Sequence, residues 1–265
     1  MPTIDTYTPG EPCWVDLMSS DPNRSTRFYT SLFGWTATEG GEEYESYVTF
    51  WKGDAQVAGL ASARPGAGVT DVWTTYLAVD EVDAVTEAAR AAGAQVLMDP
   101  TSVGDRGRLA MLLDPTGAAI GLWQAGEHAG FEVNNENASA VWHELNTDDY
   151  DAALVFYRDV FEWNLTPLSD AMKFRYSTFG AEGTMVGGVY DAHATLPDRV
   201  SSHWQLYFGV ADVPAAAARV VELGGRVLRE PWNSDFGVFA TVADPTGAIF
   251  QLGGAAVDTE SAPTA

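Results

Sequence analysis

The sequence predicts an α+β protein of two tandem domains, each built from a pair of β-α-β-β-β units. The first observation is an internal repeat, because "LDPTGAAIGLW" at 113–123 returns as "ADPTGAIFQLG" at 243–253. Two further pairs match in the same order, 21–35 with 149–163 and 76–100 with 207–231. The second observation is local: within each half a strand, a helix and further strands follow one another twice.

The first helix of each half has clear start signals. Asp21 can cap a helix with Pro22 in its first turn, an apolar stripe follows, and Gly34 ends it. The second half repeats this design from Asp149. The two apolar stripes are Phe28, Tyr29, Leu32 and Phe33, and Phe156, Tyr157, Val160 and Phe161.

The second helix of each half is expected at 81–93 and 212–225, where glycines end it. β-rich runs between the helices lie at 44–53, 55–62, 173–181 and 184–192. The polar stretch 125–139 has no regular period and is the expected linker. We therefore place the first domain at 10–128 and the second at 137–255.

The composition excludes several classes of partner. With 37 acidic and 14 basic residues the formal net charge is −23, so nucleic acid and anionic membrane surfaces would be repelled. Cys13 is the only cysteine, which rules out an intramolecular disulfide and indicates a cytoplasmic setting. No run of about 18 apolar residues predicts a membrane span. We expect a monomer or a homodimer.

The ordered motifs resemble those of the vicinal oxygen chelate superfamily, which includes glyoxalase I, extradiol dioxygenases and proteins of fosfomycin and bleomycin resistance. The motifs are an opening strand, an acidic helix start with "FYTSLFGW" or "FYRDVFEW", and a late "DPTG" turn into a final strand. The resemblance covers about 11–125 and 139–254. It implies mixed sheets curved into cups, with four ligands, usually His and Glu, inside the cup of a metal-dependent member.

The positions that match those ligands do not carry a metal set. The first-strand position falls on Trp14 or Trp142. The fourth-strand position falls near Ala58 or Gly59 in the first half and near Gly187 or Gly188 in the second. The other two fall on Thr75 or Leu206 and on Gly121 or Gln251. We expect no metal and no other cofactor. An error of one residue in register would instead offer a site of His143, His203 and Gln251, although His143 should face away from the cup if Trp142 faces in.

Strand alternation predicts what lines the cups, since residues two apart share a face. Asp16 and Glu144 then face inward beside Trp14 and Trp142, as candidate general acids or bases. Strand-end carboxylates in water are the alternative. The expected ligand-binding residues are Trp14, Trp73, Thr75, Gly121, Trp123, Trp142, Trp204, Leu206, Phe208 and Gln251. Trp35 and Trp163 are expected in the core.

The resulting hypothesis is a metal-independent protein that binds a small hydrophobic, aromatic molecule. It resembles members that sequester drugs or assist tailoring steps in antibiotic pathways. One alternative is an enzyme of this superfamily, either a lyase or dioxygenase of the glyoxalase type or a hydroxylase-like catalyst. The other is a scaffold whose aromatic side chains fill the cups.

Overall fold

The computed structural model describes residues 6–41, 44, 46–63, 70–171, 174–180, 185–197 and 200–255. The elements of the first domain are β1 (Pro12–Ser19), α1 (Pro22–Phe33), β2 (Thr36–Glu39), β3 (Val48–Lys52), β4 (Ala55–Ser62), β5 (Val72–Ala78), α2 (Val82–Ala91), β6 (Gln95–Val103), β7 (Gly107–Leu113) and β8 (Ala119–Ala125). Those of the second domain are β9 (Ala140–Thr147), α3 (Tyr150–Phe161), β10 (Thr166–Ala171), β11 (Phe174–Phe179), β12 (Gly187–Asp191), β13 (His203–Gly209), α4 (Val213–Glu222), β14 (Arg226–Ser234), β15 (Gly237–Ala243) and β16 (Ile249–Gly254).

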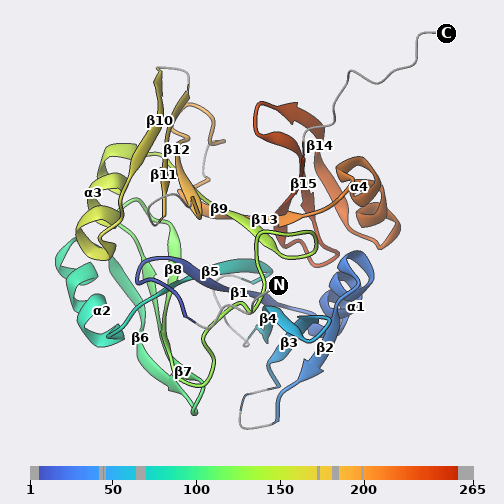
Figure 1. Cartoon of the computed structure of the whole chain (residues 1–265), viewed down its shortest axis with the longest axis horizontal. Coiled ribbons are helices and arrows are strands. Elements are labelled where there is room, and N and C mark those ends of the chain that lie inside the picture. Colours follow the sequence, from blue (N-terminus) through green and yellow to red (C-terminus); the bar gives the residue numbers. More distant parts are fainter. Residues whose placement is uncertain are drawn as a thin grey trace.

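Each domain contains one eight-stranded mixed sheet, in the order β2-β3-β4-β1-β5-β8-β7-β6 or β10-β11-β12-β9-β13-β16-β15-β14. The two units of a domain join through β1 and β5, or β9 and β13, which run antiparallel, whereas β1 and β4 run parallel. In Figure 1 the outer strands rise as walls from the central strands, and the two sheets curve away from each other. The predicted fold class is confirmed. The domain limits 10–128 and 137–255 stay predictions.

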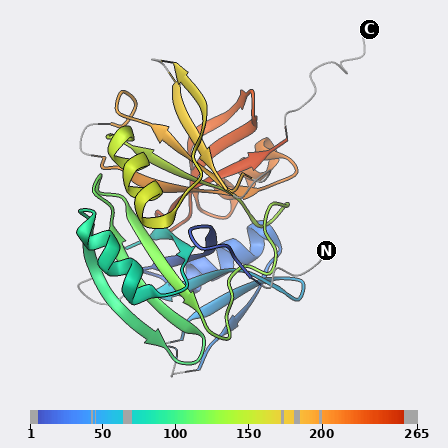
Figure 2. The same cartoon turned by 60° about the vertical axis from the view of Figure 1, so that its left-hand side comes forward.

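The helices begin where the sequence predicts. The side chain of Asp21 accepts a hydrogen bond from the backbone N–H of Arg24, and Asp149 does the same with Ala152. Gly34 ends α1 in the left-handed conformation, with φ 71°. Helix α1 contacts α4, and α2 contacts α3, so the helices of the two domains lie side by side at both flanks (Figures 1 and 2). None of the described helices is long and apolar enough to cross a bilayer.

The convex faces of the two sheets share an aromatic core. The ring of Phe208 on β13 lies 5.1 Å from Phe33 on α1 and 5.2 Å from Trp73 on β5. Trp35 also packs against Phe208, with 3% of its surface exposed. One face of the central strands therefore points into the cup of their own domain, and the other face packs against the other domain.

The aspartate of each DPTG turn ties its turn to the opposite domain. Oδ1 of Asp114 accepts hydrogen bonds from the backbone N–H groups of Thr116 and Ala118. Its Oδ2 accepts one from the hydroxyl of Tyr157 on α3, at 2.9 Å. The same hydroxyl accepts a bond from Nε1 of Trp204 at 3.1 Å. Asp114 is 3% exposed, so this chain of bonds satisfies a buried carboxylate.

The DPTG turn of the second domain makes the equivalent contact with helix α1 of the first domain. The hydroxyl of Ser25 on α1 donates to Oδ2 of Asp244 at 3.1 Å. Nε1 of Trp73 donates to the hydroxyl of Tyr29 at 3.0 Å. Burial, and then the charge of Asp244, raise the pKa of Tyr29, so this phenol stays protonated. The paired bonds fix the two domains relative to each other.

Removing one of these bonds should destabilise the whole chain. We expect Tyr157→Phe to lower the free energy of unfolding by about 1–3 kcal/mol, because the buried oxygen of Asp114 and the indole of Trp204 both lose a partner. Urea denaturation followed by circular dichroism measures the change. Tyr190→Phe removes the hydroxyl of a half-buried tyrosine on β12, which pairs with Tyr176, and serves as the control. An equal loss in both variants would contradict the assigned role.

Candidate functional site: two carboxylate-centred cups

Asp16 lies on the floor of the first cup, on β1, and is held by two phenols. The hydroxyl of Tyr76 on β5 donates to its carboxylate at 3.2–3.3 Å, and the hydroxyl of Tyr47 donates at 3.4 Å. Nε1 of Trp14 donates to the hydroxyl of Tyr47 at 2.9 Å. The result is a connected Trp–Tyr–carboxylate–Tyr cluster.

The second cup contains the same cluster around Glu144 on β9. The hydroxyls of Tyr176 and Tyr207 donate to the two carboxylate oxygens at 2.8 and 2.9 Å. Nε1 of Trp142 donates to the hydroxyl of Tyr176 at 2.9 Å. The structure thus brings Asp16 together with Trp14 and Glu144 together with Trp142 inside the cups, as the alternation predicted.

Glycines beneath the phenols make room for these clusters. A Cβ at Gly121 would lie 2.2 Å from the ring of Tyr76, and one at Gly59 would lie 1.7 Å from the hydroxyl of Tyr47. In the second cup a Cβ at Gly188 would lie 2.0 Å from the hydroxyl of Tyr176. The tyrosines occupy space that any side chain at those positions would need, so glycine there permits the arrangement.

Burial controls the charge of the floor carboxylates. Desolvation raises the pKa of Asp16 to about 7, against the opposing effect of the hydrogen bonds from Tyr76 and Tyr47. Desolvation also raises the pKa of Glu144, although Tyr176, Tyr207 and Asn146 bond to it. Asp16 consequently exchanges a proton near neutral pH, which suits a group that accepts a proton or a hydrogen bond from a ligand.

The donor set does not fit the metal that the superfamily resemblance implies. The described residues contain no group of three His, Cys, Asp or Glu side chains that could hold an ion. The floor carboxylate of each cup accepts hydrogen bonds from two phenols. His143 lies on the opposite face of β9, with Nδ1 3.1 Å from the hydroxyl oxygen of Thr75, so it cannot join His203 and Gln251. We derive no chemistry through a metal.

Five predicted lining residues face the other domain instead. The register pairs Trp14 with Tyr76 and Leu17 with Trp73, so the cup face of β5 carries Tyr76 and Thr74 rather than Trp73 and Thr75. The cup face of β13 carries Tyr207 and Gln205. The predicted cup placement is wrong for Trp73, Thr75, Trp204, Leu206 and Phe208. A shift of one residue reverses the face, and both faces are apolar here because the other domain covers the second one.

The remaining predicted positions do lie on the cup faces. Gly121 pairs with Tyr76, and Gln251 pairs with Tyr207. Trp123 is two residues beyond Gly121 on β8 and therefore shares its face. The hydroxyl of Thr241 donates to Oε1 of Gln251 at 2.9 Å.

Sequence reasoning missed the four phenols and a histidine. The phenols Tyr47, Tyr76, Tyr176 and Tyr207 all lie in the repeated segments or β-rich runs, so matched tyrosines in both halves were the available signal. His128 comes from the linker segment, and its ring lies 4.5 Å from that of Trp14. Burial lowers the pKa of His128 to about 4, so it is neutral at physiological pH. No local pattern in the linker predicts that contact.

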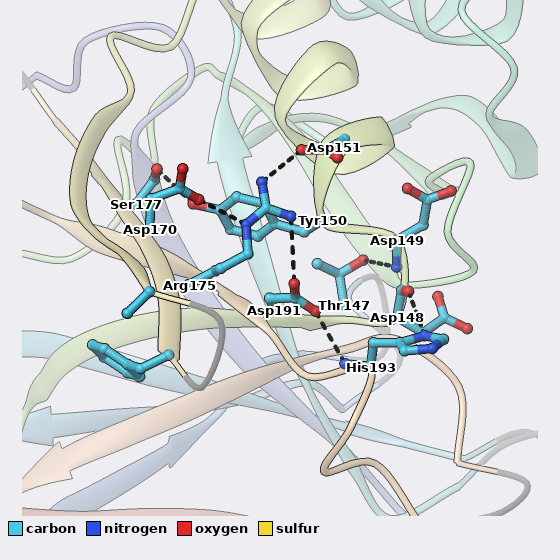
Figure 3. Close-up of polar contacts among 12 residues, drawn as sticks. Thr147, Asp148, Asp149, Tyr150, Asp151, Asp170, Arg175, Ser177, Asp191 and His193 are labelled. Atoms are coloured by element: carbon cyan, nitrogen blue, oxygen red, sulfur yellow. Dashed lines mark hydrogen bonds and ion pairs between the residues drawn. The ribbon is translucent and has the colours of Figure 1, made fainter.

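Arg175 links strand β11, which carries Tyr176, to the elements around it (Figure 3). Its guanidinium lies 4.5 Å from the ring centre of Tyr150 and pairs with Asp151 at 2.9 Å and Asp170 at 2.8 Å. Nη1 is also 3.5 Å from Asp191. These contacts join β10, β11 and β12 to the start of α3 on the face opposite the cup. The cluster supports the position of Tyr176 and does not itself enter the cup.

Comparison with known proteins places this chain in a family. The sequence pattern of the glyoxalase/bleomycin resistance protein/dioxygenase superfamily matches residues 13–122, and that of the glyoxalase-like domain matches 142–253. The chain therefore belongs to the glyoxalase/bleomycin resistance/dioxygenase superfamily, which confirms the resemblance seen in the sequence.

Two relatives align with almost the whole chain. One is CFP32 of Mycobacterium tuberculosis, which its name assigns only provisionally to the glyoxylases, at 41% identity over 95% of this chain and 97% of the relative. The other is the anthracycline biosynthesis protein DnrV of Streptomyces peucetius, at 37% identity over 93% and 94%.

Two solved structures share the fold at low identity. The Mn(II)-bound glyoxalase of Novosphingobium aromaticivorans has a TM-score of 0.63 at 18% identity, covering 96% of this chain and 86% of that one. The 2,3-dioxygenase LapB of Pseudomonas sp. KL28 has a TM-score of 0.61 at 14% identity, covering 100% and 97%. At these low identities, the similarity shows a shared fold.

The raised pKa of Asp16 should appear as a pH dependence of stability. The folded state binds the Asp16 proton more tightly than the unfolded state, so the free energy of unfolding should fall as pH rises from about 4 to about 7. We expect Asp16→Asn to flatten this part of the profile, measured by urea denaturation at each pH. Asp54→Asn, at an exposed site, is the control. Equal slopes in the parent and in Asp16→Asn would refute the shift.

Metal analysis tests the donor set directly. Protein purified without chelators should contain far less than stoichiometric zinc, nickel, iron or manganese, because the part of the chain that the structure describes assembles no set of three suitable ligands. Elemental analysis after buffer exchange gives the content. Stoichiometric metal that is lost in Glu144→Gln or Asp16→Asn would show that the cups rearrange to bind it.

Proposed function

We propose that this protein binds a small hydrophobic, aromatic molecule in a cup, without a metal, in drug sequestration or a tailoring step of an antibiotic pathway. The observation that carries the proposal is the cluster of indole, two phenols and one carboxylate on the cup floor, present in both domains. Aromatic faces supply the stacking surface, and one polar group fixes orientation, as in sites for flat apolar ligands.

The relatives support this direction. The similarity to an anthracycline biosynthesis protein covers the full tandem arrangement, and that name links the relative to an antibiotic pathway. The strongly acidic composition, with a net charge of −23, favours a neutral or cationic ligand over an anionic one. We place the protein in the cytoplasm, as a monomer or a homodimer.

Asp16 and Glu144 have a defined role in this proposal. The phenols around each carboxylate are held neutral because burial raises their pKa, so they act as hydrogen-bond donors. A ligand hydroxyl or amine that replaces one phenol donor would meet a carboxylate of raised pKa.

Catalysis is the second candidate function, because a carboxylate whose pKa is about 7 has the proton affinity of a general base at neutral pH. Asp16 would then remove a proton from an acidic O–H or C–H group of the bound molecule. Product formation that disappears in Asp16→Asn while ligand binding survives would identify this activity.

Ligand binding is testable through the tryptophans. A planar aromatic ligand should quench intrinsic fluorescence and raise the melting temperature with increasing concentration. We expect Trp142→Ala to weaken binding by about 1–3 kcal/mol, as for loss of a central aromatic anchor. Glu144→Gln should preferentially weaken the binding of ligands that carry a hydroxyl or amine, because these use the carboxylate.

Trp35 provides the matched control for that experiment. Its indole is buried between the domains and donates to the backbone oxygen of Ala138 at 2.9 Å, away from both cups. Trp35→Phe should lower stability and leave the affinity of the folded protein unchanged. No quenching by a broad panel of flat aromatics, or equal loss of binding in Trp35→Phe and Trp142→Ala, would support the filled-scaffold alternative.

A further inference from the structure

The two cups differ systematically along one row of paired residues. The register links five strands in each domain, so matching positions can be compared directly. The row in the first cup is Met98, Met111, Gly121, Tyr76 and Trp14, and the row in the second cup is Arg229, Thr241, Gln251, Tyr207 and Trp142. The tyrosine and tryptophan are kept, whereas the three outer positions change from apolar or absent side chains to polar ones.

The strands next to the carboxylates show the same change. Met18, two residues after Asp16, corresponds to Asn146, two residues after Glu144. Nδ2 of Asn146 donates to Glu144 at 3.4 Å. On the neighbouring strand Thr74, the partner of Asp16, corresponds to Gln205, the partner of Glu144. The floor of the second cup therefore presents hydrogen-bonding groups where that of the first is largely apolar.

The cups also differ in how far their tryptophans are covered. Trp14 and Trp123 are 5% and 7% exposed, and His128 from the linker packs edge-on against Trp14. Nε1 of Trp123 donates to the backbone oxygen of His128 at 2.8 Å. In the second domain Trp142 stays partly exposed, and Gly253 stands at the position that corresponds to Trp123. The indoles of the first cup are therefore more deeply buried than Trp142 of the second.

An aromatic wall with a cation lines the second cup. The rings of Trp232 and Phe239 lie 5.9 Å apart, and Phe239 lies 5.6 Å from Tyr207. The guanidinium of Arg229 lies 3.7 Å from the ring centre of Trp232. Trp232 and Phe239 are half-buried, so part of each side chain remains accessible. Ring stacking beside a guanidinium donor suits an aromatic system that carries oxygen acceptors.

We infer that the second cup is the ligand site, and that it selects aromatic rings bearing hydroxyl or carbonyl oxygens. The inference rests on the proposed function, because it names the cup and the ligand class for that binding. Hydroxyls donate to Glu144, and ligand oxygens accept from the side chains of Arg229, Asn146 and Gln205. The first cup acts as a packed domain of the same fold.

Fluorine NMR can test the location and the selectivity together. Protein labelled with 5-fluorotryptophan gives one signal for each of its nine tryptophans, and Trp→Phe variants assign Trp14, Trp123, Trp142 and Trp232. The probes are 1,5-dihydroxynaphthalene and 1,5-dimethylnaphthalene, which match in size. We expect the diol to shift Trp142 and Trp232 and to bind about five- to tenfold more tightly than the dimethyl compound, the scale of one or two hydrogen bonds.

Variants that replace second-cup residues with their first-cup equivalents test which side chains cause the selectivity. Arg229→Met and Thr241→Met, taken from the equivalent Met98 and Met111, should each weaken diol binding about three- to tenfold and leave the dimethyl compound unaffected. Arg219→Met removes an equal charge from α4, outside the cup, and should change nothing. Retained dispersion of the fluorine signals verifies folding.

The outcomes separate this inference from the proposed function. Diol-induced shifts at Trp14 and Trp123 but not at Trp142 would overturn the choice of cup. Equal affinities for the two probes at the second cup would overturn the oxygen selectivity while leaving the proposed function intact. No shift of any signal with either probe, extended to larger aromatics, would refute the proposed function itself.

Discussion

The arrangement of the two domains depends on the hydrogen bonds that two buried aspartates, Asp114 and Asp244, accept from the opposite domain. Oδ1 of Asp114 is satisfied within its own turn, but its Oδ2 bonds to a phenol of the other domain, and Asp244 is served by Ser25 in the reverse direction. An unpaired buried carboxylate would be costly, so these bonds stabilise the packing of the two sheets through their convex sides. The concave side of each sheet then faces away from the other domain (Figure 1).

The need to pair a buried carboxylate with hydrogen-bond donors also determines the floor of each cup. A carboxylate on a central strand is desolvated, and two phenols keep it hydrogen-bonded without a cation. Tyr47, Tyr76 and Tyr176 fit because glycines lie beneath them, whereas Tyr207 pairs with Gln251. The cluster of phenols and one carboxylate in each cup thus stands on a fold that the superfamily shares.

Local signals predicted most of the architecture but only part of the site. The caps at Asp21 and Asp149, the repeated turns and the inward direction of Asp16 and Glu144 follow from short-range patterns. The facing of Trp73 and Phe208 does not, because strands buried on both sides show no polar alternation to fix the register. The contact of His128 with Trp14 joins the linker to the first strand, and only tertiary packing determines it.

The reciprocal exchange between the DPTG turns and the opposite helices is an isologous contact, the kind that relates two identical subunits. Each half presents an aspartate and a helix surface that can serve a second copy of itself as well as its neighbour in the chain. The tandem protein thus has the geometry of a homodimer whose two copies lie in one chain. Because the copies are parts of one chain, their cups can carry different residues, which a symmetric dimer of one sequence does not allow.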